Sequence, residues 1–229
     1  MSILYLGGAI IVLFVFRSRI PQAFELVMSD IFSWRAITFG VARGVFSNEA
    51  GLGSSVIAHA QSDVEEPVEQ GMWGILEVFL DTIIMCTITG LVILVSGVYG
   101  GGNDGAVLTL AAFSKVFGNW GETILTISIF LFALSTLIGW SFFGSQCVAY
   151  LCKDKMRRPM QQVYLAIYYG VIFLGCFGQL QTVWKISDTC NSLLAIPNLL
   201  CLILLRHQVT DLTKEYLDGK PMEKGVRRI

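Results

Sequence analysis

Long apolar runs are the feature that most restricts how this chain can fold. Four of them, near residues 74–98, 123–151, 162–178 and 186–205, carry at most two charged residues each. A helix that crosses the hydrocarbon core of a bilayer needs about 20 mainly apolar residues. Lipid offers no hydrogen-bond partner to an open strand, so such runs are expected to be helices. The sequence therefore predicts an all-α integral membrane protein.

Composition agrees with this prediction. The 229 residues are 54% hydrophobic and only 14% charged, whereas a soluble domain usually carries about a quarter charged residues. The net charge is −1, so there is no basic field that would attract nucleic acid. The six cysteines show neither a C-x-x-C pair nor zinc-type spacing, and most lie inside apolar runs as small hydrophobes.

The two ends of the chain bear on topology. The apolar stretch before Arg17 has 16 residues, about 24 Å of helix, so residues 1–20 are predicted to be the end of a truncated transmembrane helix. Basic residues crowd into 153–160 and into the tail, residues 206–229. Basic loops mark the cytoplasmic side, so we expect a multi-pass protein with a cytoplasmic C-terminus. The arginines before residue 36 conflict with this rule if residues 36–60 cross the membrane.

Residues 36–60 form the most polar segment between apolar runs. Four glycines there lower helix propensity by about 1 kcal/mol each relative to alanine. Arg43 and Glu49 would be costly against lipid, so the segment must face protein or water. Helices that unwind at the membrane midplane to bind substrate have this chemistry. The alternative is a polar loop that follows a G-x-x-x-G packing face at Gly40 and Gly44.

The run FALSTLIGW, residues 132–140, is a second polar interruption. Thr136 and Trp140 are four apart and share one helix face. The adjacent hydroxyls of Ser135 and Thr136 are suitable ligands for a hard cation. The alternative is that both hydroxyls bond to carbonyls of their own helix.

Other polar residues favour structural roles over catalysis. Glu77 and Asp81 open one apolar run and Asp188 opens another, where acids stabilise a helix N-terminus. No G-x-S-x-G motif occurs, and an intramembrane hydrolase built from Ser47 or Ser54 with His59 is the weakest reading. The chain is not expected to be an enzyme.

Several motifs together resemble one transporter family. The segments FGVARGVFSNEAGLGSSVIAHA, PVEQG, EVFLDTIIMCTITGLVIL, FALSTLIGW and IPNLL follow one another over most of residues 39–200. They are similar to the alanine or glycine:cation symporters, also called sodium:alanine symporters, in their C-terminal portion. The resemblance implies a LeuT-type helical bundle. The chain would supply the second inverted repeat (helices 6–10), with its first helix broken, plus the end of helix 5.

The resemblance also implies a set of site residues. The broken helix and the eighth helix of this fold contribute the substrate contacts, and the eighth helix contributes hydroxyls to a sodium site. The matching substrate positions are Gly44, Phe46, Ser47, Asn48, Thr136 and Trp140. The matching sodium positions are Ser135 and Thr136.

The function implied is sodium-coupled symport of a small neutral amino acid, alanine or glycine, across the plasma membrane. Sodium is the coupling ion and no cofactor is expected. The partners are the amino acid and the lipid bilayer, with no nucleic acid. Because the first repeat is not in this sequence, the chain is expected to be a truncated C-terminal portion. The alternative is a non-transporting fragment, or an accessory membrane subunit that needs a separate first repeat.

Overall fold

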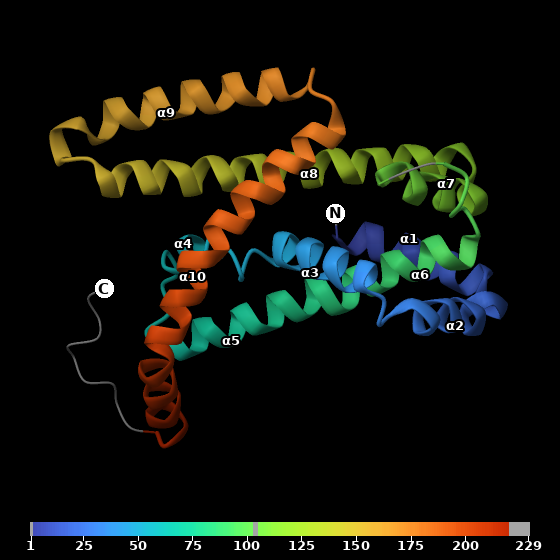
Figure 1. Cartoon of the computed structure of the whole chain (residues 1–229), viewed down its shortest axis with the longest axis horizontal. Coiled ribbons are helices and arrows are strands. Elements are labelled where there is room, and N and C mark those ends of the chain that lie inside the picture. Colours follow the sequence, from blue (N-terminus) through green and yellow to red (C-terminus); the bar gives the residue numbers. More distant parts are fainter. Residues whose placement is uncertain (1, 103–104, 220–229) are drawn as a thin grey trace. The chain divides into compact units, whose positions relative to one another are not determined.

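The computed structural model describes residues 2–102 and 105–219, and most of them are helical (Figure 1). No strand occurs in these ranges, so the all-helical prediction is confirmed. The elements are α1 (Ser2–Val15), the 3-10 turn η1 (Arg17–Arg19), α2 (Ile20–Asp30), α3 (Trp34–Asn48), α4 (Ser55–His59), α5 (Pro67–Val78), the π-helix η2 (Phe79–Met85), α6 (Cys86–Ser96), α7 (Ala106–Phe117), α8 (Asn119–Leu151), α9 (Asp154–Gly175) and α10 (Leu180–Leu217).

The chain divides into two compact units. The first consists of the residues up to 41 together with residues 80–144. The second consists of residues 42–79 and the residues from 145 onward. Each unit is described by itself below.

The first unit holds a small apolar core where α1, α6, α7 and the beginning of α8 meet. Its buried members are Tyr5, Ala9, Val12, Val92, Ala112, Phe113 and Leu125. The ring of Tyr5 stacks on Phe113 at 5.8 Å between centroids. Gly8 permits this approach, since a Cβ there would lie 2.8 Å from the Phe113 ring.

Two basic side chains cap the C-terminal end of α6. Lys115 donates from Nζ to the Ser96 carbonyl at 2.7 Å, and Arg19 donates from Nη1 to the Val95 carbonyl at 3.4 Å. The last carbonyls of a helix have no partner within the helix and carry partial negative charge, which cations neutralise. Arg19, counted in the sequence as a topology signal, therefore also has a local structural role.

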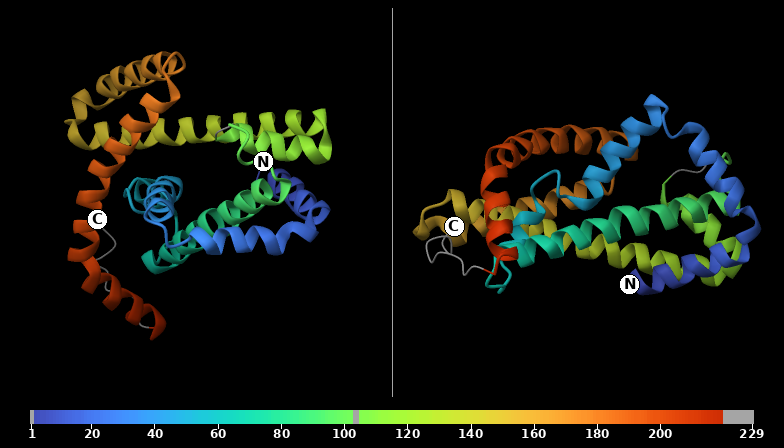
Figure 2. Two further views of the ribbon diagram at one scale, coloured as in Figure 1. Left: turned by 45° about the vertical axis from the view of Figure 1, so that its right-hand side comes forward. Right: turned by 90° about the horizontal axis from the view of Figure 1, so that it is seen from below.

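α1 and α2 meet at a sharp bend. The axes of Ser2–Val15 and Arg17–Asp30 differ by 75°, and α1 and α2 both contact α6 in this unit (Figures 1 and 2). Of the predicted truncated helix, residues 1–20, α1 occupies only the part up to Val15. Residue 1 lies outside the described residues.

Three continuous helical stretches in the described residues are long and apolar enough to cross a membrane. They are Pro67–Ser96, Asn119–Leu151 and Leu180–Leu217, and the bent pair α1–α2 is a fourth if it counts as one span. Large apolar side chains stand on their surfaces, as Leu204 does at 77% exposure. A helix that is apolar all around without being buried in protein requires lipid. The predicted run 162–178 falls in α9 and the turn after it.

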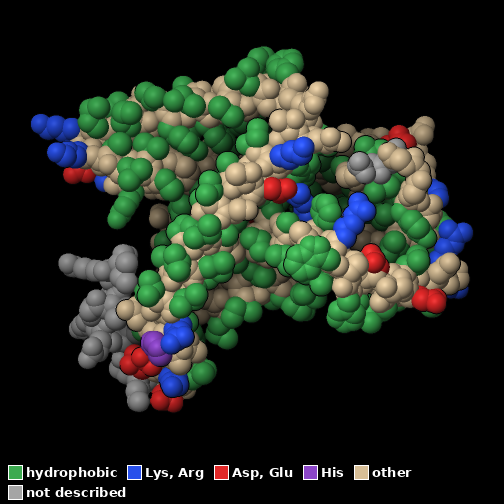
Figure 3. Space-filling model, viewed as in Figure 1, with side chains coloured by type: hydrophobic (Ala, Val, Ile, Leu, Met, Phe, Trp, Pro, Cys, Tyr) green, Lys and Arg blue, Asp and Glu red, His purple; other side chains and the backbone are tan. Residues whose placement is uncertain are grey.

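In the second unit, hydrophobic side chains stand along the visible faces of α9 and of the middle of α10 (Figure 3). Lys and Arg side chains gather at the end where α9 begins (Figure 3), and the sequence there contains Lys153, Lys155, Arg157 and Arg158. The tail predicted from residue 206 starts as a continuation of α10 to Leu217, and residues 220–229 lie outside the described residues.

Two helices begin earlier than their apolar runs indicated. α5 begins at Pro67 rather than near residue 74, so Glu77 is ten residues inside the helix. α10 begins at Leu180, which places Asp188 more than two turns inside. The expectation that these acids sit at helix N-termini is therefore wrong. Pro197 stands inside α10, which continues past it to Leu217.

Candidate functional site

The helix expected to unwind within residues 36–60 is interrupted between Asn48 and Ser55. Glu49 has φ 56° and Gly53 has φ 76°, both in the left-handed region. The amides of Leu52 and Gly53 bond back to the Glu49 carbonyl at 3.0 and 3.1 Å, which closes a tight turn. Glycine adopts such a φ without steric cost, so the G-L-G sequence allows the chain to turn here.

Side chains bond to polar groups of the interrupted segment. Asn198 of α10 donates from Nδ2 to the carbonyls of Ala50 and Gly51, each at 3.0 Å. Ser54, which is buried, donates to the Glu49 carboxylate at 2.9 Å. Non-helical backbone at membrane depth persists only where protein or water satisfies it. Asn198 was not among the predicted site residues. The sequence nevertheless marks it, because it is a polar amide next to Pro197 inside an apolar run.

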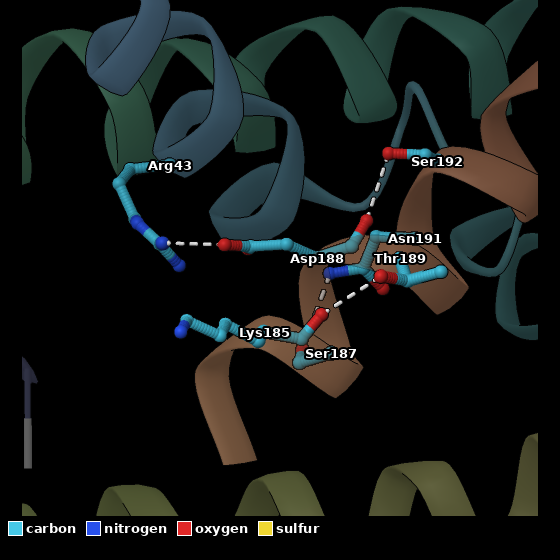
Figure 4. Close-up of polar contacts among 7 residues, drawn as sticks. All are labelled: Arg43, Lys185, Ser187, Asp188, Thr189, Asn191 and Ser192. Atoms are coloured by element: carbon cyan, nitrogen blue, oxygen red, sulfur yellow. Dashed lines mark hydrogen bonds and ion pairs between the residues drawn. The ribbon is translucent and has the colours of Figure 1, made fainter. Parts of the chain in front are cut away.

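Just before the interruption, α3 is joined to α10 by charge and by aromatic contact. Arg43 donates from Nη2 to the Asp188 carboxylate at 2.9 Å (Figure 4). The same guanidinium lies over the Trp184 ring, 4.1 Å from its centroid. Phe46 meets that ring edge to face at 5.7 Å. The arginine that the sequence required to face protein or water thus faces α10.

Just after the interruption, a cavity of about 360 Å³ lies against α4 and α5. Asn48, Ala50 and Ser55 line it from the interrupted helix, and His59 and Glu77 line its polar side. The His59 ring bonds through Nδ1 to Gln70 at 2.7 Å and through Nε2 to the Glu77 carboxylate at 3.3 Å. His59, isolated in the sequence, therefore connects α4 to α5.

The predicted site residues fall in both units. The last turns of α3, in the second unit, contain Gly44, Phe46, Ser47 and Asn48. The side-chain oxygen of Asn48 accepts a hydrogen bond from the Ala50 amide at 3.1 Å. Ser135, Thr136 and Trp140 lie on α8 in the first unit.

The α8 hydroxyls bond within their own helix. Ser135 donates to the Phe132 carbonyl at 2.8 Å, and Thr136 donates to the same carbonyl at 3.0 Å. This is the alternative that the sequence left open. A hydroxyl whose proton is donated still presents lone pairs, so both oxygens keep the ability to coordinate a cation.

Transition-metal chemistry has no candidate among the described residues. In residues 2–102 and 105–219, no three His, Cys, Asp or Glu side chains come together in a way that would hold a metal ion.

Helices long enough to cross a membrane, together with an interruption held by polar side chains from another helix, define a multi-pass helical membrane protein. The chain matches the model of the sodium:alanine symporter family over residues 1–227, and it belongs to that family. The family consists of membrane transporters and not enzymes.

Individual relatives agree with the family. The chain is 39% identical to the sodium/alanine symporter AgcS of Methanococcus maripaludis, over 94% of this chain and 49% of the relative. It is 36% identical to an uncharacterized transporter of Haemophilus influenzae, over 94% of this chain and 50% of the relative. It is 33% identical to the probable sodium/glutamine symporter GlnT of Bacillus subtilis, over 98% and 48%. The chain thus spans about half the length of the curated relatives that it matches.

Proposed function

We propose that this chain carries half of the substrate pathway of a sodium-coupled symporter for a small neutral amino acid, alanine or glycine. The observation that carries the proposal is the interruption at residues 49–54, where Asn198 donates to the carbonyls of Ala50 and Gly51 and Ser54 donates to the Glu49 carboxylate. Family membership supplies the transport class and sodium as the coupling ion.

The fold proposed is a LeuT-type bundle. In it the chain forms the second inverted repeat, with α3 and α4 as its broken first helix and α1 as the end of the preceding helix. Interrupted helices in this architecture bind substrate and ions through freed backbone groups and helix ends near the midplane; LeuT is itself the standing example of that principle. The basic start of α9 supports a cytoplasmic C-terminus in the plasma membrane.

The binding roles proposed follow the same residues as the sequence prediction. Gly44, Phe46, Ser47 and Asn48 would contact the amino acid from α3. Thr136 and Trp140 would contact it from α8, and the oxygens of Ser135 and Thr136 would coordinate sodium. One relative is named as a sodium/alanine symporter and another as a probable sodium/glutamine symporter. Alanine and glutamine have the same amino and carboxylate groups but different side chains. The shared part of the site therefore recognises the backbone of the amino acid.

The test is binding of labelled alanine to the purified chain in lipid nanodiscs, with sodium or choline as the cation. We expect binding in sodium only, with glycine as a competitor. Thr136→Ala is expected to weaken both alanine and sodium binding about tenfold. Thr123→Ala is the matched control, because Thr123 also bonds within α8, to the Asn119 carbonyl.

The outcomes separate the alternatives. Equal binding in choline would overturn sodium coupling. Absence of binding in both buffers favours a non-transporting membrane subunit, and co-expression with the N-terminal half of a relative then tests whether a separate first repeat restores binding.

A further inference from the structure

Arg43, which directly precedes the proposed binding residues of α3, makes two different contacts with α10. It forms an ion pair with Asp188 and stacks on Trp184, which in turn contacts Phe46. Trp184 and Asp188 are four residues apart, so they share one face of α10. The contacts thus join one short stretch of α3 to one face of α10.

We propose that Arg43 and Asp188 are positioning residues of the transporter. Their ion pair holds the last turn of α3, with Phe46, Ser47 and Asn48, in the position in which those residues bind substrate. The ion pair breaks when the site releases the substrate. The proposal rests on the proposed function, because the residues that the ion pair positions are the proposed substrate contacts. Arg43 and Asp188 themselves lie outside that set.

The geometry of the pair suits a contact that forms and breaks. Only one hydrogen bond is formed, from Nη2 to Oδ2, whereas the strongest arginine–carboxylate pairs are bidentate. Nη1 is enclosed and has no hydrogen-bond acceptor among the described residues. Both side chains retain partial exposure, 37% for Arg43 and 42% for Asp188. Water can therefore replace either partner at moderate cost.

α10 contacts the interrupted helix both before the interruption and within it. Asp188 holds α3 before it, and Asn198 bonds to the carbonyls of Ala50 and Gly51 within it. The two residues are ten apart, about 15 Å along α10. The Asn198 contact involves only neutral groups. Of the two contacts, only the Arg43–Asp188 ion pair can therefore be tested by exchanging charges.

The test exchanges the charges. Arg43→Asp and Asp188→Arg are made singly and together, and Lys185→Gln serves as the control. Lys185 projects from α10 on the same side as the Arg43 guanidinium (Figure 4), so its substitution changes the local charge without removing either member of the pair.

Two readouts are measured on each variant in nanodiscs. The first is alanine affinity in sodium. The second is the rate at which a maleimide labels a cysteine at the exposed position 50, in a background without the six native cysteines. The labelling rate reports on the interrupted helix and needs no substrate, so the positioning role is tested even if the proposed function fails.

We expect each single variant to label at least fivefold faster and to bind alanine at least tenfold more weakly. The double variant should return both values to within threefold of the parent, and Lys185→Gln should leave both unchanged. The labelling rate could be restored while no variant binds alanine, either alone or co-expressed with the N-terminal half of a relative. That result would refute the proposed function and retain the positioning role. The role is overturned if the single variants label like the parent, or if the double variant shows the combined defects of the two singles.

Discussion

Gly53 is the residue on which the interrupted helix depends most directly. Its φ of 76° lies in the left-handed region, and a Cβ at this position would stand 2.6 Å from the Asn198 side-chain oxygen. Both facts exclude a side chain, the first because of backbone strain and the second because of space. The same amide that bonds to Ala50 and Gly51 would have to move.

Gly53→Ala is expected to destabilise the second unit by about 2 kcal/mol or more, since the left-handed conformation alone costs about 1–2 kcal/mol. The measurement is the thermal midpoint in detergent. Gly170→Ala is the matched control: it lies in α9 with no atom within 4 Å of the new Cβ, and it should raise stability slightly. An equal response of the two variants would contradict the close contact with Asn198.

Asn198→Asp tests the other side of the same contact. The carboxylate keeps the shape of the amide but replaces the donor with an acceptor that faces two carbonyl oxygens. Loss of two hydrogen bonds, at roughly 1 kcal/mol each, predicts a destabilisation of about 2 kcal/mol. Asn191→Asp is the control, because its single side-chain bond, 3.4 Å to Ser187, stays within α10. A thermal midpoint equal to that of the control would show that these carbonyls do not need the amide.

Among the helices, α6 has a C-terminal end that is capped by two charged residues far apart in the sequence, Arg19 and Lys115. Its last two carbonyls receive donors from η1 and from α7. The C-cap residue Gly97, with φ 65°, ends the helix without a side chain, and a Cβ there would lie 3.6 Å from Arg19 Nη1. The apolar core of the first unit lies around the same helix, so this cap also fixes the position of α7.

Lys115→Gln is expected to lower the stability of the first unit by about 0.5–1 kcal/mol, the usual value of a cation at a helix C-terminus. The neutral side chain is shorter and lacks the charge that interacts with the Ser96 carbonyl. Lys155→Gln, at an exposed position of α9, is the control. The comparison of thermal midpoints is made at low and high salt, and a loss that does not diminish in high salt would argue against a charge effect.

The helices and the interruption were accessible from sequence because each depends on local chemistry. Apolar length alone predicted helices in the runs near residues 74–98, 123–151 and 186–205. Glycines next to charged residues indicated the interruption. Apolar length does not mark where a helix starts, because polar turns can precede the apolar run; α5 begins at Pro67, a type of residue that is frequent at the first helical position.

The partners of the interrupted helix could not be predicted in the same way. Arg43 required a polar neighbour, but nothing local selects Asp188, which is 145 residues away. Asn198 is 147 residues from Gly51. Such pairs depend on which helices pack together, which periodicity does not encode. The predicted roles of Ser135, Thr136 and Trp140 stay predictions.

For the whole molecule, the property that matters most is its topology, that is, which helix ends lie on the same side of the membrane. Basic residues cluster at the start of α9 and in residues 206–229, whereas the segment before α7 is rich in glycine. The positive-inside rule then predicts that residues 152–160 and the tail lie in the cytoplasm, and that the glycine-rich segment before α7 lies outside. Arg19 weakens the contrary signal near the N-terminus, because its charge interacts with α6.

Single-cysteine reporters at positions 101, 155 and 215 test this topology in intact cells, in a background without the native cysteines. A membrane-impermeant maleimide should label position 101 at once, but positions 155 and 215 only after permeabilisation. The physical reason is that α8, at 33 residues, is about 50 Å long, which is enough to cross the bilayer between the first two reporters. Labelling of positions 101 and 155 from the same side would show that α8 does not cross. Labelling of 155 and 215 from opposite sides would leave α9 and α10 with only one crossing between them, and the proposed repeat would be wrong.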